Sequence, residues 1–319
     1  MRASILHERA GAPAQAVLLV LLTLAWPLAG LAQEVTLVPH WKAGDRQRIE
    51  LVRVREDASG ARAEIRTEIT LTVHAVSADG FAVHWQYGPP RVQDTDAQRA
   101  ALTTEVAAAM QHLRYELDVD ATGRLRGVTN WKDVRDAADR AASTVLQRLR
   151  ERGLPEAAAT VVGDQIRGSF ATEQQVLQQG VREAAIYHSV FGRSYRLNVP
   201  VPVGGALASP VGGISVPSKG ELVLTALDPA TGRARIAATQ AVDPEAARRL
   251  ALASLTEMLA KMGRPAPPPD SIPPLAINDT GEYVVDVATG WVRSLTIRRE
   301  SRAGEQTRRD ILTATEIAP

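Results

Sequence analysis

The 319-residue chain contains no cysteine, and aromatic residues make up only 4% of it. Without cysteine no disulfide can hold the protein together, so its stability has to come from a hydrophobic core. The scarcity of aromatic side chains argues against a stacking platform for bases or sugars. Apolar residues make up 45% of the chain, which is enough to build a core in a protein of this length.

An excess of charge of either sign is also missing, since the formal net charge is +1. Removal of residues 1–32 would leave basic and acidic residues equal in number, and no long block of one sign stands out. Phosphate binding requires a basic surface. We therefore expect no nucleic-acid partner.

Only one long apolar run is present, and it lies at the N-terminus in a segment that reads as an export signal, residues 1–32. Two arginines precede an apolar stretch of ten residues, Ala16–Ala25, and Gly30-Leu31-Ala32 follows as a small-x-small cleavage site. We expect cleavage near Ala32 and a mature protein in the periplasm or outside the cell. The alternative is an uncleaved anchor, but the run is shorter than the roughly 20 residues of a spanning helix. No membrane span is expected after cleavage.

Alternating apolar and polar residues predict β-strands in the first and last thirds of the chain. The clearest case is Arg62–Ala75, which alternates throughout and therefore predicts a long strand with one solvent-exposed face. Apolar residues spaced three and four apart predict helices at 95–113 and 244–262 and through most of 131–191. A stretch rich in Gly, Pro and Ser, Val203–Lys219, predicts a loop.

The order of these segments predicts an α+β fold with antiparallel β-meander sheets and a central helical block packed on one face. We expect four parts: a signal peptide at 1–32, an N-terminal β-rich half with one helix at 33–130, the helical block at 131–191, and a C-terminal β-rich half at 192–319 with one helix and a Pro-rich linker at Gly263–Pro274. Both halves read hairpin, helix, hairpin, which suggests an internal duplication. The two halves could form one sheet or two.

The tripeptide Ala-Thr-Gly occurs at 121–123, 230–232 and 288–290. The first copy follows Asp118 and Asp120, so it begins like a calcium loop, D-x-D-x-T-G. A calcium loop needs a bidentate Glu at its twelfth position, where this chain has Thr129. Hairpin turns explain all three copies better, because Gly accepts a positive φ and Asp or Thr side chains bond to the turn backbone.

Two histidines, His74 and His84, are the candidate metal ligands. A three-residue loop that pairs Ser77 with Phe81 would place them opposite each other on the exposed face, with Cβ atoms about 5 Å apart. Such a pair can bind a metal or sense pH. A metal site needs a third ligand, and the neighbouring Thr and Gln side chains are poor ligands. Two histidines facing water are therefore the favoured interpretation.

The sequence offers none of the common catalytic or cofactor motifs: no G-x-S-x-G, no H-E-x-x-H, no P-loop and no G-x-G-x-x-G that opens a βαβ unit. We therefore assign no catalytic residue and no cofactor. Glu64 and Glu68 could do acid–base chemistry, but they alternate with arginines along an exposed strand face. That pattern is typical of solubility and edge protection.

An early Trp-x-x-Gly, Trp41 to Gly44, and a late D-x-x-T-G-x-V, Asp286 to Val292, accompany the export signal and the long alternating strands. In these features the chain resembles a loose group of exported bacterial proteins of unknown function. The resemblance covers the β segments and not the helical block. It implies an exported, β-rich protein and brings no catalytic residues.

The leading hypothesis is a non-enzymatic envelope protein that binds a lipidic or apolar small molecule, or an envelope protein partner, between sheet and helices. Crevices lined by Val, Leu and Ala suit lipidic ligands better than charged ones. One alternative is an envelope hydrolase whose carboxylates converge only in three dimensions, and another is a purely structural module.

Overall fold

The computed structural model describes residues 34–110, 113–153, 155–208, 215–261, 265, 268 and 274–317. The expected signal peptide and most of the Pro-rich linker lie outside these residues. Within the described part of the chain, no helix is long and apolar enough to cross a membrane.

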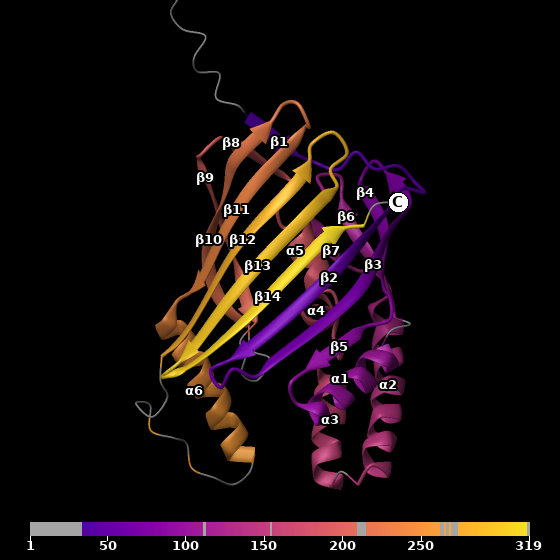
Figure 1. The fold of residues 1–319 in the computed structure, drawn as a ribbon, viewed down its shortest axis with the longest axis vertical. Helices are drawn as coiled ribbons and strands as arrows, with labels where there is room; N and C mark the ends of the chain where they lie inside the picture. The colour runs from indigo at the N-terminus through magenta and orange to yellow at the C-terminus, as the bar shows by residue number, and fades with distance from the viewer. Residues whose placement is uncertain are drawn as a thin grey trace, which may run out of the picture. The chain divides into compact units, whose positions relative to one another are not determined.

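One antiparallel sheet of twelve strands dominates the fold (Figure 1). Its strands follow in the order β7 (Leu125–Val128), β6 (Arg114–Asp120), β4 (Gly80–Tyr87), β3 (Arg62–Ser77), β2 (Arg46–Asp57), β14 (Gln306–Glu316), β13 (Val292–Ala303), β12 (Leu275–Asp286), β11 (Arg233–Val242), β10 (Ser215–Asp228) and β9 (Pro200–Ala208), with β5 (Arg91–Asp94) paired to β3. The expectation of antiparallel meanders combined with helices is confirmed at this level, although strands outweigh helices more than a balanced α+β fold implies.

The first and last thirds of the chain share this sheet, because β2 pairs with β14 from Ile49 to Asp57. A second, two-stranded sheet joins β1 (Glu34–Leu37) to β8 (Arg193–Arg196). Both expected halves also show the same local connection. Helix α1 (Ala97–Met110) lies between β4 and β6, which pair with each other, and α6 (Pro244–Lys261) lies between β11 and β12, which also pair.

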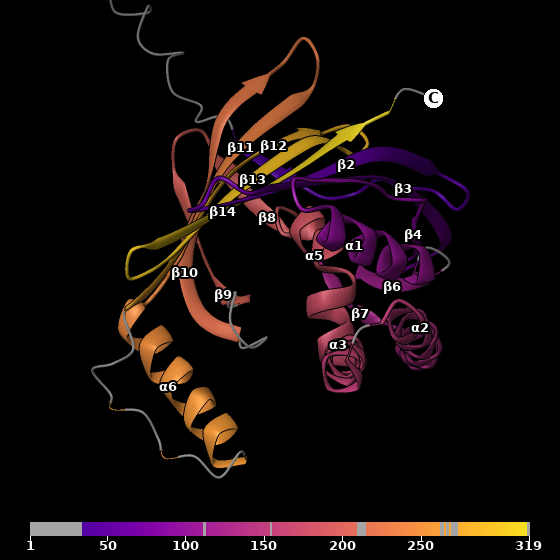
Figure 2. The ribbon, with the colours of Figure 1, turned by 60° about the horizontal axis from the view of Figure 1, so that its bottom comes forward.

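The expected helical block consists of α2 (Trp131–Glu151), α3 (Glu156–Gly168), α4 (Glu173–Gln175), the π-helical turn η1 (Val176–Gly180) and α5 (Arg182–His188). Figure 2 shows the sheet curving over α5, which lies on its inner face. Helices α2 and α3 pack on each other through a separate small cluster that includes Leu146, Leu149 and Ala159. The block meets the sheet through η1, α5 and the first turns of α2, whose Val134 belongs to the main core.

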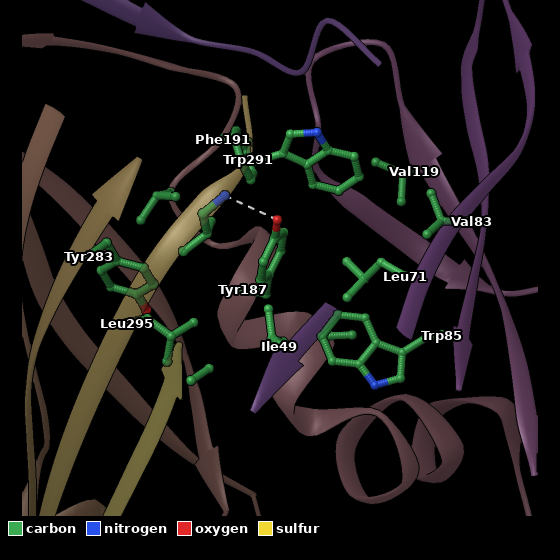
Figure 3. Packing of buried hydrophobic residues seen from close by; sticks show 14 of the residues in the cluster. Ile49, Leu71, Val83, Trp85, Val119, Tyr187, Phe191, Tyr283, Trp291 and Leu295 are labelled. Atoms are coloured by element: carbon green, nitrogen blue, oxygen red, sulfur yellow. Dashed lines mark hydrogen bonds between the residues drawn. The ribbon is translucent and has the colours of Figure 1, made fainter. Parts of the chain in front are cut away.

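The main core lies between α5 and the inner face of the sheet (Figure 3). Tyr187 of α5 points into its centre, with Trp85 and Leu71 from the N-terminal strands on one side and Leu295 and Tyr283 from the C-terminal strands on the other (Figure 3). These side chains are almost fully buried. A chain without disulfides thus obtains its stability from one core shared by both thirds of the sequence.

All three Ala-Thr-Gly copies close β-hairpins, as predicted. The glycines adopt positive φ values of 93°, 65° and 72° at Gly123, Gly232 and Gly290. In each copy the preceding aspartate bonds back to the turn: Asp120 Oδ1 accepts the N–H of Thr122, for example, at 2.8 Å. No cluster of metal-ligating side chains occurs among the described residues, so nothing supports the calcium-loop alternative.

The predicted loop Val203–Lys219 is wrong over most of its length. Strand β9 continues to Ala208 and β10 begins at Ser215, and the two pair in register. The prediction failed because Gly and Pro were read as loop signals. Gly204 and Gly205 lie on the outer strand β9, and Pro217 lies where β10 pairs with β9 but not with β11. Positions with an unpaired edge tolerate both residues, because a proline that lacks its N–H costs little there.

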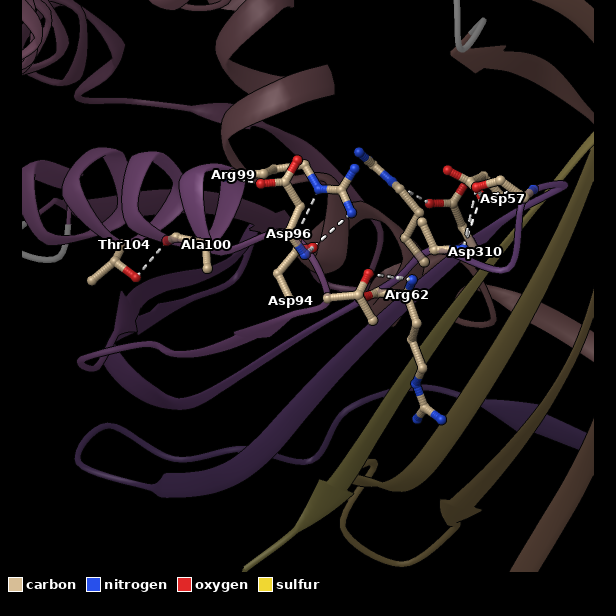
Figure 4. Close-up of polar contacts among 12 residues, drawn as sticks. Asp57, Arg62, Asp94, Asp96, Arg99, Ala100, Thr104 and Asp310 are labelled. Carbon is tan, nitrogen blue, oxygen red and sulfur yellow. Dashed lines mark hydrogen bonds and ion pairs between the residues drawn. The ribbon is translucent and has the colours of Figure 1, made fainter.

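Polar side chains fix where the helices begin. Before α1, the carboxylate of Asp96 accepts the N–H of Arg99 at 3.1 Å, and the Arg99 guanidinium binds both oxygens of Asp94 (Figure 4). Before α2, Asn130 makes no helix-capping bond with its side chain. It bonds instead to the backbone of β6, at Glu116 N and Arg114 O, and so fixes α2 to the sheet.

Candidate functional site

A cavity of about 440 Å³ lies between α5 and the inner face of strands β9 to β13. Most of its lining is apolar and comes from both layers, with Leu177 and Ile186 on the helical side and Val203, Leu222 and Ile297 on the sheet. We call this space the sheet–helix cavity. Sequence reasoning placed a crevice between sheet and helices, and the structure has one there.

Three glycines border the cavity along the sheet, and Gly205 is the one that leaves open space in it. Gly204 and Gly205 on β9 and Gly281 on β12 are among its lining residues. A Cβ atom at Gly281 would lie 2.4 Å from Cδ1 of Ile297, so this position is filled by its neighbour. A Cβ atom at Gly205 would meet only Gln240 Nε2, at 3.6 Å, so the space above Gly205 is open.

A row of polar side chains crosses the inner face beside the cavity. Five consecutive strands each contribute one directly paired residue, in the order Gln240, Asp279, Arg299, Asp310 and Arg55. We call it the charged row. Directly paired residues of an antiparallel sheet project to the same face, so one row of charges separates the main core from a smaller cluster around Leu275 and Ile277.

The carboxylates of the charged row are already paired. Both oxygens of Asp279 accept bonds from Arg299, at 2.7 and 2.6 Å, and both side chains are nearly buried. Asp310 accepts bonds from Arg308 and Arg55. Burial raises the pKa of Asp310, but these two guanidinium groups outweigh burial and hold the pKa below its ordinary value. Both aspartates are therefore already paired with arginines of the sheet.

Two arginines at the cavity, unlike those of the charged row, have no carboxylate partner among the described residues. Arg182, the first residue of α5, lines both the sheet–helix cavity and a small adjoining hollow of about 30 Å³. Arg193 on β8 lines the cavity, and its Nε atom is buried without a hydrogen bond. Within the described part of the chain, neither guanidinium group forms an ion pair. Burial, together with the nearby charges of Arg299 and Arg53, lowers the pKa of Arg182 to about 10, while the charges of Asp279 and Asp310 raise it in part.

Helix α5 is held against the sheet by the side chains that follow Arg182. The buried carboxylate of Glu183 pairs with Arg53 and accepts a bond from the Tyr87 hydroxyl at 2.8 Å. Burial raises the pKa of Tyr87 to about 12, so this hydroxyl keeps its proton. One turn later the Tyr187 hydroxyl bonds to Gln47 on β2. Glu183 and Tyr187 thereby fix α5 against the sheet. Arg182 and Ile186, which are four residues apart on the adjacent face of the helix, line the cavity.

The segment after β1 closes the end of the sheet at two of the Ala-Thr-Gly turns. Cβ atoms added at Gly123 and Gly290 would lie 2.7 and 2.5 Å from atoms of Pro39, so both turns touch this proline. The ring of Trp41 stacks on that of Trp291 at 4.5 Å. This end of the molecule is tightly packed, and the cavity lies away from it.

The predicted pairing of the two histidines is wrong in register, although the rings do meet. A two-residue turn pairs Ser77 with Gly80, and a bulge at His74 leaves His84 opposite Thr72. The imidazoles of His74 and His84 nevertheless stack at 4.7 Å. Burial lowers the pKa of His84, and Arg114 and His74 lower it further. Among the described residues, no group of three or more His, Asp or Glu side chains is placed to hold a metal ion.

The sequence did not single out the residues of the charged row or the two unpaired arginines. One signal was present: Arg182, Ala185, Ile186 and Ser189 recur at helical spacing, so a lone arginine falls on a helix face made of small and apolar residues.

A scan against models of known protein families and a search of the curated proteins both find no match for this chain.

Proposed function

We propose that this is an exported protein, periplasmic or secreted, that binds an apolar small molecule in the sheet–helix cavity and catalyses no reaction on it. The observation that carries the proposal is the cavity itself. Its volume of about 440 Å³ falls within the range of roughly 300–1,000 Å³ typical of small-molecule sites. Its lining is mainly apolar and comes from both the sheet and the helices.

The arrangement of charges supports binding over hydrolysis. A hydrolase that uses two carboxylates needs both of them to face one bound group. Among the described residues that line the cavity, Asp279 is the only carboxylate, and Arg299 occupies both of its oxygens. Apolar surface, in contrast, is available on both walls.

Export rests on the sequence of residues 1–32, which reads as a cleavable signal. Cell fractionation followed by N-terminal sequencing tests it. We expect the protein outside the cytoplasm with Gln33 at its N-terminus. An intact chain recovered from the cytoplasm would contradict export and leave the cavity proposal to its own test.

The binding test uses N-phenyl-1-naphthylamine, a neutral apolar dye whose fluorescence rises in an apolar site. The wild-type protein should bind it saturably. Gly205→Leu places a branched side chain in the open space above β9 and should weaken dye binding by about tenfold or more.

Gly204→Leu is the matched control. A Cβ atom at Gly204 meets nothing within 4 Å, and neighbouring residues of a strand project to opposite faces. This variant makes the same chemical change on the same strand and should bind the dye like the wild type. Failure of the wild type to bind dye, or equal binding by both leucine variants, would refute the proposed site.

A further inference from the structure

The charges around the sheet–helix cavity do not balance. Asp279 is paired with Arg299, Asp310 with Arg308 and Arg55, and Glu183 with Arg53. Arg182 and Arg193 remain as cations at the cavity with no carboxylate partner among the described residues. The chain therefore presents positive charge to a space that is otherwise mostly apolar.

Arg182 is partly removed from water and has no ion-pair partner among the described residues. It is half-buried and lines two adjoining hollows, and the charges that act on it are those of Arg299 and Arg53 as well as those of the already paired Asp279 and Asp310. Removing a cation from water without pairing it is unfavourable. An anion delivered into the cavity would relieve this cost. A guanidinium group is well suited to that role, because its planar fork matches carboxylate and phosphate oxygens in two parallel hydrogen bonds.

Rigid support makes Arg182 a defined binding group. It begins α5 directly beside Glu183, whose carboxylate is fixed by Arg53 and Tyr87. The paired aspartates cannot swing over to neutralise it without abandoning their own arginines. A ligand anion is then the partner that completes the charge balance without breaking an existing ion pair.

We propose that the ligand of the sheet–helix cavity is an anionic amphiphile, a single acyl chain whose carboxylate or phosphate headgroup pairs with Arg182, with Arg193 as a second cation. This inference rests on the proposed function and specifies the chemical class of the ligand. The apolar walls around Ile186, Leu222 and Val203 receive the chain. The neighbouring ion pairs keep Asp279 and Asp310 from repelling the headgroup.

The test compares decanoate, decyl phosphate and 1-decanol as competitors of the bound neutral dye. The three share a ten-carbon chain and differ in the headgroup. The wild-type protein should bind at least one of the two anions about tenfold or more tighter than 1-decanol, as expected for hydrogen bonds to a charged group. The tighter of the two anions identifies the headgroup as that of a free fatty acid or of a phosphate-bearing lipid. Acetate and inorganic phosphate alone should compete weakly, since they lack the chain.

Arg182→Gln should lower the affinity for the anion to that for 1-decanol and leave dye binding unchanged. The unchanged dye signal shows that the cavity is still folded. Arg140→Gln is the matched control, because it removes the same charge from an exposed position on α2. It should preserve the anion preference.

The outcomes separate the two proposals. If the wild type binds the dye but shows no preference for either anion, or if Arg182→Gln keeps the preference, the headgroup inference is wrong and the apolar site stands. If neither dye nor any decyl compound binds, the proposed function fails, and the inference fails with it.

Discussion

Replacing Tyr187 by Phe would remove one hydroxyl group from the centre of the core and leave the packing of the ring in place (Figure 3). That hydroxyl joins α5 to strands from both the first and the last third of the chain. It donates to Gln47 Oε1 on β2 at 2.8 Å and accepts the N–H of Val292 on β13 at 3.1 Å. Gln47 is only 3% exposed, so water cannot take the place of the hydroxyl there.

The expected loss follows from the two groups left unpaired. A buried donor or acceptor without a partner costs about 1–3 kcal/mol. Gln47 keeps the two bonds of its Nε2 atom, to the carbonyl oxygen of Val292 and to Glu316 Oε1, which limits the loss of stability. We therefore expect Tyr187→Phe to lower the free energy of unfolding by about 2–4 kcal/mol, which corresponds to a fall in Tm of roughly 3–7 °C for a chain of this length.

Tyr195→Phe is the matched control. Its hydroxyl is also buried but donates to a single partner, the carbonyl oxygen of Val190, at 2.7 Å. This variant should lose only about 1 kcal/mol. Urea unfolding followed by tryptophan fluorescence, together with differential scanning calorimetry, measures both. A loss for Tyr187→Phe no larger than that for Tyr195→Phe would refute the claim that this hydroxyl links strands from the first third of the chain to strands from the last third.

Two further predictions concern the closed end of the sheet. Burial lowers the pKa of His188 to about 4, below its unfolded value near 6.5, so folding disfavours protonation. The stability that the neutral ring contributes is fully present above pH 6.5 and falls by about 3 kcal/mol as the pH drops to 4. The free energy of unfolding, measured from pH 6.5 to pH 4, should therefore depend less on pH in His188→Gln than in the wild type. Among the turns, Gly290→Ala should destabilise more than Gly232→Ala, because both strain a positive φ but only the Cβ at Gly290 meets Pro39, at 2.5 Å. Equal losses in thermal unfolding would show that the contact with Pro39 does not matter.

Most of the sheet could be predicted from local pattern alone. A long alternating segment such as Arg62–Ala75 has one face that must be buried, and the structure has a strand at Arg62–Ser77. The turns followed from Ala-Thr-Gly because its chemistry is local, within four residues. The prediction failed where local chemistry points both ways, as in Val203–Lys219, whose glycines and prolines suit either a loop or a strand at the edge of a sheet.

The cavity chemistry could not be predicted in the same way. Asp279, Arg299 and Asp310 meet because three strands pair in one register, and register depends on turns and bulges far from these residues. The misplaced pairing of His74 and His84 shows how a single bulge defeats such reasoning. The sequence shows that Arg182 lies on a helix face of small and apolar residues. Its lack of an ion-pair partner, however, depends on the folded structure.

We propose that the charged row serves the binding site, by engaging the aspartates near Arg182, more than it serves stability. A buried ion pair such as Asp279 with Arg299 rarely stabilises a protein more than apolar residues of the same size would. A row of matched pairs does, however, hold polar groups rigidly in an apolar wall. Because Asp279 and Asp310 are engaged by other arginines, Arg182 has no carboxylate partner among the described residues. On this reasoning Asp279→Asn with Arg299→Met would leave the unpaired cation in place and preserve the anion preference, whereas Arg182→Gln would abolish it while every pair in the row stays intact.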